Sequence, residues 1–226
     1  MLNKFRIIPR FEIKSRNLIK GIKMEGLKKI DNFLEKIINY QNQGADEIII
    51  DDIVASLYSR EIDLEFISKV AELVNIPLTV GGGIKNIYDI DKLMNAGADR
   101  VSINSAAVED VNIIIDASKK FGRQCIVSQV LTKKINDDYK IFYLSGRENP
   151  NILLKDWLSL LEEIGSGEIN LLSIDNDGML SGCDKKLINN SISDKKISVI
   201  YGGGISNISD IQFLIKNNFQ GVIISQ

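Results

Sequence analysis

The chain has 226 residues, 44% of them hydrophobic and 26% charged, which is typical of a globular protein and excludes a disordered or fibrous one. The formal net charge of −2 gives no reason to expect a nucleic-acid partner, and the absence of histidine excludes Ser-His-Asp and Cys-His catalysis as well as histidine-ligated metals. Two cysteines, Cys125 and Cys183, are too few for a disulfide framework or a four-cysteine zinc site. We expect no metal and no cofactor.

The N-terminal residues 1–10 carry three basic side chains but lack the uninterrupted apolar core of a signal peptide. Farther along the chain, no stretch approaches the roughly 20 apolar residues of a membrane-spanning helix. We therefore expect a cytoplasmic protein that does not contact a membrane.

Short runs rich in β-branched residues predict eight strands. In chain order they cover residues 6–13, 47–50, 77–80, 100–103, 125–131, 168–174, 198–201 and 221–225. Most of the intervening segments carry apolar residues three or four positions apart, as in Phe33, Ile37 and Tyr40, and this spacing predicts helices. Strands and helices that alternate over this length indicate either a (β/α)8 barrel or a doubly wound parallel sheet.

An internal repeat favours the barrel. A shift of 121 positions aligns residues 80–104 with residues 201–225, and eleven of these 25 positions are identical. Two equal halves of four βα units close naturally into an eight-stranded barrel. We therefore expect one α/β domain over residues 1–226, a (β/α)8 barrel whose half-barrels cover about residues 1–121 and 122–226. Because the chain ends at Gln226, directly after the eighth predicted strand, we expect the last helix to be missing.

Glycine triplets follow the third and the seventh predicted strands, at residues 81–83 and 202–204. The C-terminal ends of barrel strands carry the functional site, and glycine lets backbone N–H groups approach an anion closely. The alternative is that these residues bind no anion. The glycines would then be required only by a tight turn, and the nearby polar residues would only cap helices. Two equivalent triplets nevertheless favour a ligand with a phosphate at each end. The predicted phosphate sites are Gly82, Gly83, Asn104 and Ser105 in the first half, and Gly203, Gly204 and Ser225 in the second.

Longer motifs resemble a known family. Residues 80–84, GADRVSINSAAVE at 97–109, FGRQCIV at 121–127 and SIDNDGMLSGCD at 173–184 look like the cyclase subunit of imidazole glycerol phosphate synthase. The resemblance runs along the whole chain. It implies a heterodimer in which the barrel receives ammonia from a glutaminase subunit through its core. With that ammonia the barrel cleaves and cyclises a doubly phosphorylated ribulosyl-formimino substrate.

The resemblance also implies catalytic residues. Lys20, Asp52 and Asp177 match residues of the family's site, and Gly178 falls on its second phosphate loop. Glu12 stands where the family has its first catalytic aspartate, which preserves a carboxylate. Leu131 stands where the family has the second, and leucine cannot transfer a proton.

Two further features follow from the resemblance. Asp99 matches a residue that contacts the glutaminase, although it could also only cap a connection between two elements. In the family, a ring of charged residues surrounds the ammonia entrance. The resemblance places the corresponding ring here at Arg6, Glu47, Arg100 and Glu168. Such a ring could also only close the bottom of the barrel with salt bridges.

Four functions are compatible with these residues. The first is the cyclase of histidine biosynthesis, slowed by the loss of one aspartate. The second is a divergent paralogue that supplies ammonia to an amidotransferase of bacterial surface sugars, a branch that the segments PRFEIK and NLIKG resemble more closely. The third is a non-catalytic barrel that activates the glutaminase and conducts ammonia. The fourth is the related isomerase acting one step earlier, which the SIDNDG segment fits less well.

Overall fold

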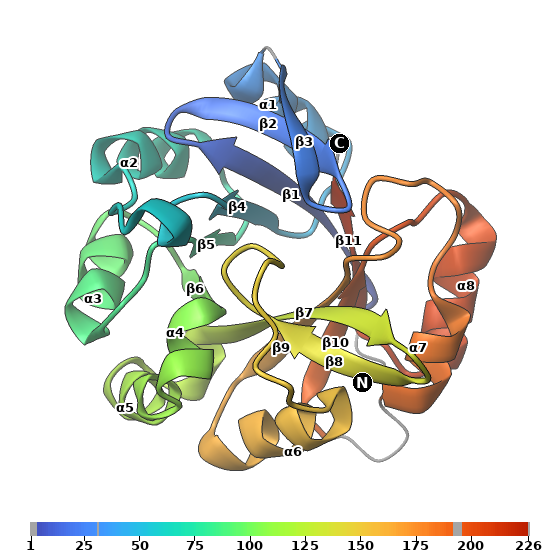
Figure 1. Cartoon of the computed structure of the whole chain (residues 1–226). Coiled ribbons are helices and arrows are strands. Elements are labelled where there is room, and N and C mark those ends of the chain that lie inside the picture. The colour runs from blue at the N-terminus through green and yellow to red at the C-terminus, as the bar shows by residue number, and fades with distance from the viewer. Residues whose placement is uncertain (1–3, 31, 192–195, 226) are drawn as a thin grey trace.

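The computed structural model describes residues 4–30, 32–191 and 196–225, and its parallel strands close into a barrel (Figure 1). In order around the barrel the strands are β1 (Arg6–Lys14), β4 (Ile48–Asp52), β5 (Leu78–Gly81), β6 (Arg100–Ile103), β7 (Ile126–Ile135), β9 (Glu168–Ser173), β10 (Ser198–Gly202) and β11 (Gly221–Ser225). Strand β11 pairs in parallel with β1, from Gly221 opposite Arg6 to Ser225 opposite Arg10. This closure confirms the predicted (β/α)8 barrel and excludes an open, doubly wound sheet.

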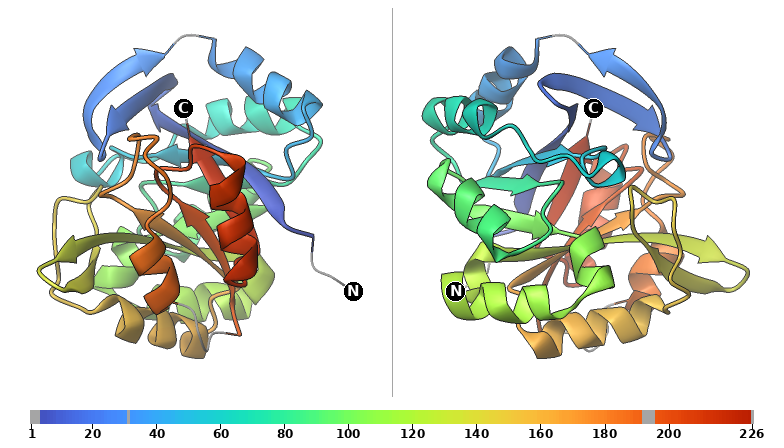
Figure 2. Two further views of the ribbon diagram at one scale, coloured as in Figure 1. Left: turned by 90° about the vertical axis from the view of Figure 1, so that its right-hand side faces the viewer. Right: turned by 60° about the vertical axis from the view of Figure 1, so that its left-hand side comes forward.

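The helices form an outer layer around the strands (Figures 1 and 2). They are α1 (Phe33–Asn42), α2 (Leu64–Leu73), α3 (Ile87–Asn95), α4 (Ser105–Glu109), α5 (Asn112–Phe121), α6 (Leu154–Ile164), α7 (Lys185–Ser191) and α8 (Ile208–Lys216), with 3-10 turns at Ser56–Tyr58 and Arg123–Cys125. The apolar face predicted for α1 is confirmed, because Phe33 and Ile37 are buried and Tyr40 packs against the core. Within the described residues, no helix has the length and apolar character needed to cross a membrane.

The core has two apolar layers because successive residues of a strand point to opposite faces. On β1, Phe11 packs outward beneath the helices, whereas Ile8 packs inside the barrel. Arg6, Arg10 and Glu12 are separated from Ile8 by an even number of positions, so they also point into the barrel. The interior therefore carries charge on the same strand that supplies part of its apolar packing.

The repeat of 121 residues is visible in local hydrogen bonds. Helices α3 and α8 begin with the same capping box, made by Asn86 with Asp89 in the first half and by Asn207 with Asp210 in the second. In each box the asparagine oxygen accepts from the N–H of the aspartate, and the aspartate side chain accepts from the N–H of the asparagine. The two halves thus share hydrogen bonding as well as sequence.

A β-hairpin that the sequence analysis did not predict follows β1. Its strands, β2 (Asn17–Ile22) and β3 (Glu25–Ile30), are antiparallel, and β2 also pairs with the end of β1. The hairpin turns at Lys23 and Met24, which both have positive φ, at 52° and 63°. Such turns normally carry asparagine and glycine. Lysine and methionine give no sequence signal for the turn, which explains why it was missed.

Strand β7 is longer than predicted. It continues to Ile135 and turns into β8 (Asp138–Phe142), which pairs with it in antiparallel fashion. The two strands project beyond the barrel at its C-terminal end, as the side views of Figure 2 show. The C-terminal end of the barrel is therefore enclosed by two hairpins, one from each half of the chain.

Candidate active site

Three of the predicted catalytic side chains meet at the C-terminal end of the barrel, where Lys20 of β2 bridges two carboxylates. The Lys20 ammonium lies 3.1 Å from Glu12 Oε2 on β1 and 3.0 Å from Asp177 Oδ1 in the loop after β9. It also donates to the hydroxyl of Ser225 at the end of β11, over 3.1 Å. The unpredicted hairpin is therefore what carries an ammonium group to the barrel mouth.

Two buried residues that the sequence analysis missed extend this group into the barrel. Arg10 Nη1 lies 2.6 Å from Glu12 Oε1, and Arg10 Nη2 lies 2.6 Å from Asp51 Oδ2. The Nε–H of Arg10 is buried and has no hydrogen-bond partner in the described part of the chain. A sequence signal for this arrangement exists, because Arg6, Arg10 and Glu12 fall on one face of a strand whose other face is apolar.

The charges of this mouth cluster, defined as Arg10, Glu12, Lys20, Asp51 and Asp177, do not balance. Two cations face three carboxylates, and Oδ2 of Asp177 is buried without a partner among the described residues. Burial raises the pKa of the Glu12 carboxyl above its ordinary value, although Arg10 and Lys20 attract the ionised form. Burial works against protonated Arg10, but attraction to Glu12 and Asp51 outweighs it and raises the pKa of Arg10. A carboxyl with a raised pKa exchanges its proton closer to neutral pH, which suits general acid–base chemistry.

A cavity at the mouth brings the first predicted phosphate site next to this cluster. Its lining includes the four predicted residues and part of the mouth cluster, together with side chains of β7: Gly82, Gly83, Asn104, Ser105, Arg10, Asp51, Gln129 and Leu131. Leu131, which is only 2% exposed, belongs to the apolar cluster inside the barrel. This first cavity therefore combines the glycine loop, a buried guanidinium and Leu131, the residue at which the resemblance implies a carboxylate in the family.

The side chain of Asn104 builds the cavity wall and does not cap helix α4. Asn104 occupies the N-cap position of α4 without a side-chain capping bond. Its Nδ2 donates to the carbonyl oxygens of Gln129, at 2.9 Å, and Phe142, at 3.3 Å. The next residue, Ser105, accepts at its hydroxyl from the N–H of Leu144 over 3.1 Å. Both side chains thus fix the β7–β8 hairpin against the first cavity.

Asp52, the fourth predicted catalytic residue, also lines the first cavity but lies outside the mouth cluster. Its oxygens accept from Arg60 Nη2, at 2.9 and 2.8 Å, and from the backbone N–H groups of Ser15 and Val54. Burial raises the pKa of Asp52, against the attraction of Arg60. In this arrangement Asp52 holds the loop after β4 to the end of β1.

The middle glycine of each triplet is required by packing. A Cβ atom at Gly82 would lie 2.4 Å from the carbonyl oxygen of Asp52, and one at Gly203 would lie 2.6 Å from that of Ser173. Both glycines have positive φ, at 102° and 113°. These two contacts are related by the 121-residue shift. The tight-turn explanation for the triplets therefore holds in both halves, alongside any role in binding an anion.

The second predicted phosphate site is divided in the structure. Gly178 and Ser225 line a groove beside Lys20 and the hairpin. Gly204 is buried beneath the loop after β9, where its carbonyl oxygen accepts from the N–H of Gly182 over 2.8 Å, and Gly203 is only partly exposed. The mouth cluster borders both hollows, because Lys20 lines the groove and Arg10 lines the first cavity.

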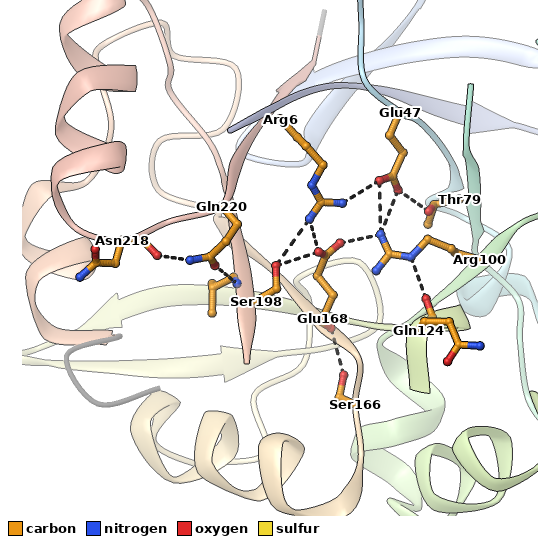
Figure 3. Close-up of polar contacts among 11 residues, drawn as sticks. Arg6, Glu47, Thr79, Arg100, Gln124, Ser166, Glu168, Ser198, Asn218 and Gln220 are labelled. Atoms are coloured by element: carbon orange, nitrogen blue, oxygen red, sulfur yellow. Dashed lines mark hydrogen bonds and ion pairs between the residues drawn. The ribbon is translucent and has the colours of Figure 1, made fainter. Parts of the chain in front are cut away.

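The four residues of the predicted ring lie together at the opposite end of the barrel, with arginine and glutamate alternating (Figure 3). Arg6 pairs with Glu47 at 3.1 Å and also pairs with Glu168, while Arg100 lies 3.3 Å from Glu47 and 2.7 Å from Glu168. The hydroxyl of Ser198 donates to Glu168 over 2.9 Å. The side chains of the two glutamates are 4% and 5% exposed, so the ring closes the barrel bottom with paired charges.

The two glutamates of the ring differ in how strongly their ionised forms are stabilised. Burial raises the pKa of Glu47, against the attraction of Arg100 and the hydrogen bond from Thr79. Burial also opposes ionisation of Glu168, but the attraction of Arg100 and Arg6 outweighs it and lowers the pKa of that carboxyl. Glu168 is therefore the firmer anchor for both guanidinium groups.

Asp99, the predicted partner contact, is exposed at the ring end of the barrel. Its Oδ2 accepts from the N–H of Leu78 over 2.8 Å. In the second half, Gln220 makes the equivalent bond, since its side-chain oxygen accepts from the N–H of Val199 over 2.8 Å. Asp99 thus caps the start of β5, and glutamine performs the same task 121 residues later.

Comparison with known proteins gives consistent matches along the chain. The model of a family described as "Histidine biosynthesis protein" matches residues 6–226. The chain is similar to imidazole glycerol phosphate synthase subunit HisF of Natranaerobius thermophilus, with 43% identity over 205 residues that cover 91% of this chain and 82% of that protein. The subunit of the same name from Lactococcus lactis subsp. lactis is 42% identical over 96% of this chain and 84% of its own length. That of Legionella pneumophila is 40% identical over 92% of this chain and 99% of its own length.

Proposed function

Since the chain belongs to the histidine biosynthesis protein family and is an enzyme of the imidazole glycerol phosphate synthase cyclase type, we propose that it takes up ammonia at the ring end of its barrel and uses it at the mouth. The proposed donor of ammonia is a glutaminase subunit bound as a heterodimer. The proposed substrate is a ribulosyl-formimino compound with a phosphate at each end. No metal or cofactor takes part in this proposal.

The observation that carries the proposal is the bridge from Glu12 through Lys20 to Asp177 at the barrel mouth. Addition of ammonia to a carbonyl carbon leaves a nitrogen with a proton to lose and an oxygen that gains negative charge. A carboxylate such as Glu12 can accept the proton, and the Lys20 ammonium can stabilise the oxyanion. Asp177, whose Oδ2 has no partner among the described residues, is the second acceptor within the same group.

The ring supports ammonia entry at the other end of the barrel. At the barrel bottom lie Arg6, Arg100, Glu47 and Glu168, each paired with residues of opposite charge. Apolar side chains would fill this space without the cost of removing four charges from water. An ion-pair ring can open and close by exchanging partners, which suits passage of a small neutral molecule.

A second candidate function is the supply of ammonia to an amidotransferase that modifies a bacterial surface sugar. The observation that favours it is Leu131, an apolar side chain on the wall of the first cavity where the resemblance implies a catalytic carboxylate. In that case the barrel would activate the glutaminase and conduct ammonia without making imidazole glycerol phosphate.

The experiment that separates these candidates is an assay of the purified protein with ammonium salt and the ribulosyl-formimino substrate. Imidazole glycerol phosphate and the aminoimidazole carboxamide ribotide should appear together in equal amounts. Absence of both products, with glutamine hydrolysis by the partner still stimulated, would favour the second candidate and reject the first.

The first cavity should bind an inorganic anion more firmly than the second glycine triplet. Crystals soaked in sulfate or phosphate should show the anion beside Gly83 and Asn104, because both residues line the first cavity and a glycine places no side chain between the anion and the backbone. We expect lower occupancy at Gly204, which the loop after β9 covers. Density at Gly204 with none at Gly83 would contradict this order.

Asp99 should contribute its negative charge to the glutaminase interface. We expect Asp99→Lys to weaken the complex at micromolar protein concentration, measured by co-purification and by the stimulation of glutamine hydrolysis. Asp99→Gln is the matched control, because Gln220 makes the same backbone bond in the second half. This control should retain the fold and lose only the charge. If Asp99→Lys and Asp99→Gln lose stability equally and neither weakens binding of the glutaminase, Asp99 serves only as a cap.

A further inference from the structure

The mouth cluster contains a cation for which the proposed chemistry gives no role. The side chain of Arg10 is only 2% exposed, points into the barrel, and bridges Glu12 on its own strand to Asp51 on the neighbouring strand β4. Asp51 lies opposite Glu12 in the register of the two strands. The guanidinium is therefore fixed between two rigid elements, directly beside the carboxylate proposed to transfer protons.

Packing alone does not explain an arginine at this position. An apolar cluster that includes Ile8, Ile49, Ile200 and Ile223 lies inside the barrel, and a leucine or isoleucine at residue 10 would extend it. Buried ion pairs often stabilise a fold no better than apolar residues of similar volume. The buried Nε–H, for which the described residues provide no acceptor, adds a further cost, because it loses its hydrogen bond to water without gaining another. A buried charge that packing does not require is found mainly at functional sites.

The contacts of Glu12 show what the guanidinium does. Arg10 Nη1 holds Glu12 Oε1 at 2.6 Å, whereas Lys20 approaches the two oxygens at 3.2 and 3.1 Å. Lys20 divides its donors among Glu12, Asp177 and Ser225, and it stands on a hairpin outside the barrel. Arg10 contacts Glu12 more closely and from within the barrel wall. The orientation of the carboxylate is thus set by Arg10.

We propose that Arg10, held in place by Asp51, is a positioning residue that fixes the carboxylate of Glu12 and favours its ionised form. The proposal rests on the proposed function, since it presumes that Glu12 is the acid–base group. It adds a residue pair inside the barrel that governs when that group can accept a proton.

The charged groups around Glu12 come from four elements, and their signs determine the expected effects. Arg10 on β1 and Lys20 on β2 favour the carboxylate, whereas Asp51 on β4 and Asp177 in the loop after β9 disfavour it. Removal of Arg10 leaves one ammonium beside three carboxylates, so Glu12 should hold its proton to higher pH. Removal of the Asp51 charge should have the opposite effect.

The test is a titration of Glu12 itself. Carbon NMR monitors the Glu12 carboxyl in protein labelled at glutamate side-chain carboxyls, and the Glu12→Gln variant assigns its signal. We expect Arg10→Met to raise the titration midpoint by at least about one pH unit, a tenfold change in proton affinity, as expected for an opposite charge in contact. Asp51→Asn should lower the midpoint. In the ammonium-dependent assay, the acid limb of kcat/KM should move with the midpoint in each variant, and KM should change less than kcat.

Arg16→Met is the matched control, because it removes a guanidinium that is half exposed and paired with Asp63 and Glu65 at the surface. It should leave the Glu12 midpoint and the rate unchanged. If Arg10→Met fails to fold, the single variant Asp51→Leu is compared with the double variant Arg10→Met/Asp51→Leu. The titration midpoint of Glu12 should be higher in the double variant, which lacks Arg10. The proposal is overturned if a folded protein without Arg10 has a Glu12 titration midpoint within a few tenths of a pH unit of the matching protein that retains Arg10. The NMR midpoint needs no turnover, so an inactive protein would reject the proposed function and still decide this inference.

Discussion

The purified protein should form imidazole glycerol phosphate from ammonium and the ribulosyl-formimino substrate at least about a hundredfold more slowly than a relative with aspartate at both catalytic positions. A correctly placed acid–base group typically contributes about 10²–10⁴ to the rate. Leu131 has no group that exchanges a proton, and it occupies the wall of the first cavity. In addition, Glu12 carries one more methylene than aspartate, which displaces its carboxylate by roughly an ångström, and displacements of that size can also cost about a hundredfold.

Two substitutions at this position make the comparison within one protein. Leu131→Asp should raise the ammonium-dependent rate by about tenfold or more, and Leu131→Asn should not, because only the first restores a group that transfers protons. Both place a polar side chain of similar size in the same apolar surroundings, so thermal unfolding should show similar costs. A wild-type rate within a few-fold of the two-aspartate relative would contradict the prediction, and it would mean that Glu12, or another group such as Asp52 or Asp177, suffices.

Glu168→Ala should lower the free energy of unfolding by about 3–5 kcal/mol in a urea titration. Loss of this carboxylate leaves Glu47 as the one carboxylate that pairs with Arg6 and Arg100 among the described residues, and removal of one member of a buried ion-pair network leaves charge without compensation. The lowered pKa of Glu168, which the two guanidiniums maintain against burial, shows how strongly the ring favours its ionised form.

Ser198→Ala is the control for this experiment. Its hydroxyl donates to the same carboxylate, over 2.9 Å, but carries no charge, so we expect a loss of only about 1 kcal/mol. Similar losses for the two variants would mean that the ring contributes hydrogen bonds and little electrostatic stabilisation. Because Glu168 lies at the far end of the barrel from the mouth cluster, neither variant should alter the titration of Glu12.

The barrel itself could be predicted from the sequence because its determinants are local. Alternating β-branched runs and apolar helical faces indicated the βα units, and the 121-residue repeat selected the closed form. The hairpin could not be predicted in this way. Its turn places Lys23 and Met24 in the left-handed region, and the energy that holds them there comes from pairing of β2 with β1 and β3. Tertiary contacts of this kind leave no trace in turn-residue preferences.

The candidate site was predictable in part. The resemblance indicated Glu12, Lys20 and Asp177, which the structure brings within hydrogen-bond distance of one another through Lys20. The contact between Arg10 and Asp51 was not predicted, because it depends on the register of β1 against β4. Asp52, adjacent in sequence to Asp51, points to Arg60 instead. Neighbouring residues of a strand face opposite sides, so which of two consecutive aspartates enters the cluster is decided only by the barrel.

Parallel closure of the barrel places the two ends of the described chain at opposite poles. Strand β1 starts in the ring with Arg6, whereas β11 ends at Ser225 within reach of Lys20. An affinity tag or fluorescent fusion attached ahead of β1 would thus share the pole proposed for the glutaminase, and one attached behind β11 would share the pole of the cavities. Association measurements call for the second kind of fusion and turnover measurements for the first. A pair of fluorophores, one at each terminus, would report the two events separately on a single molecule.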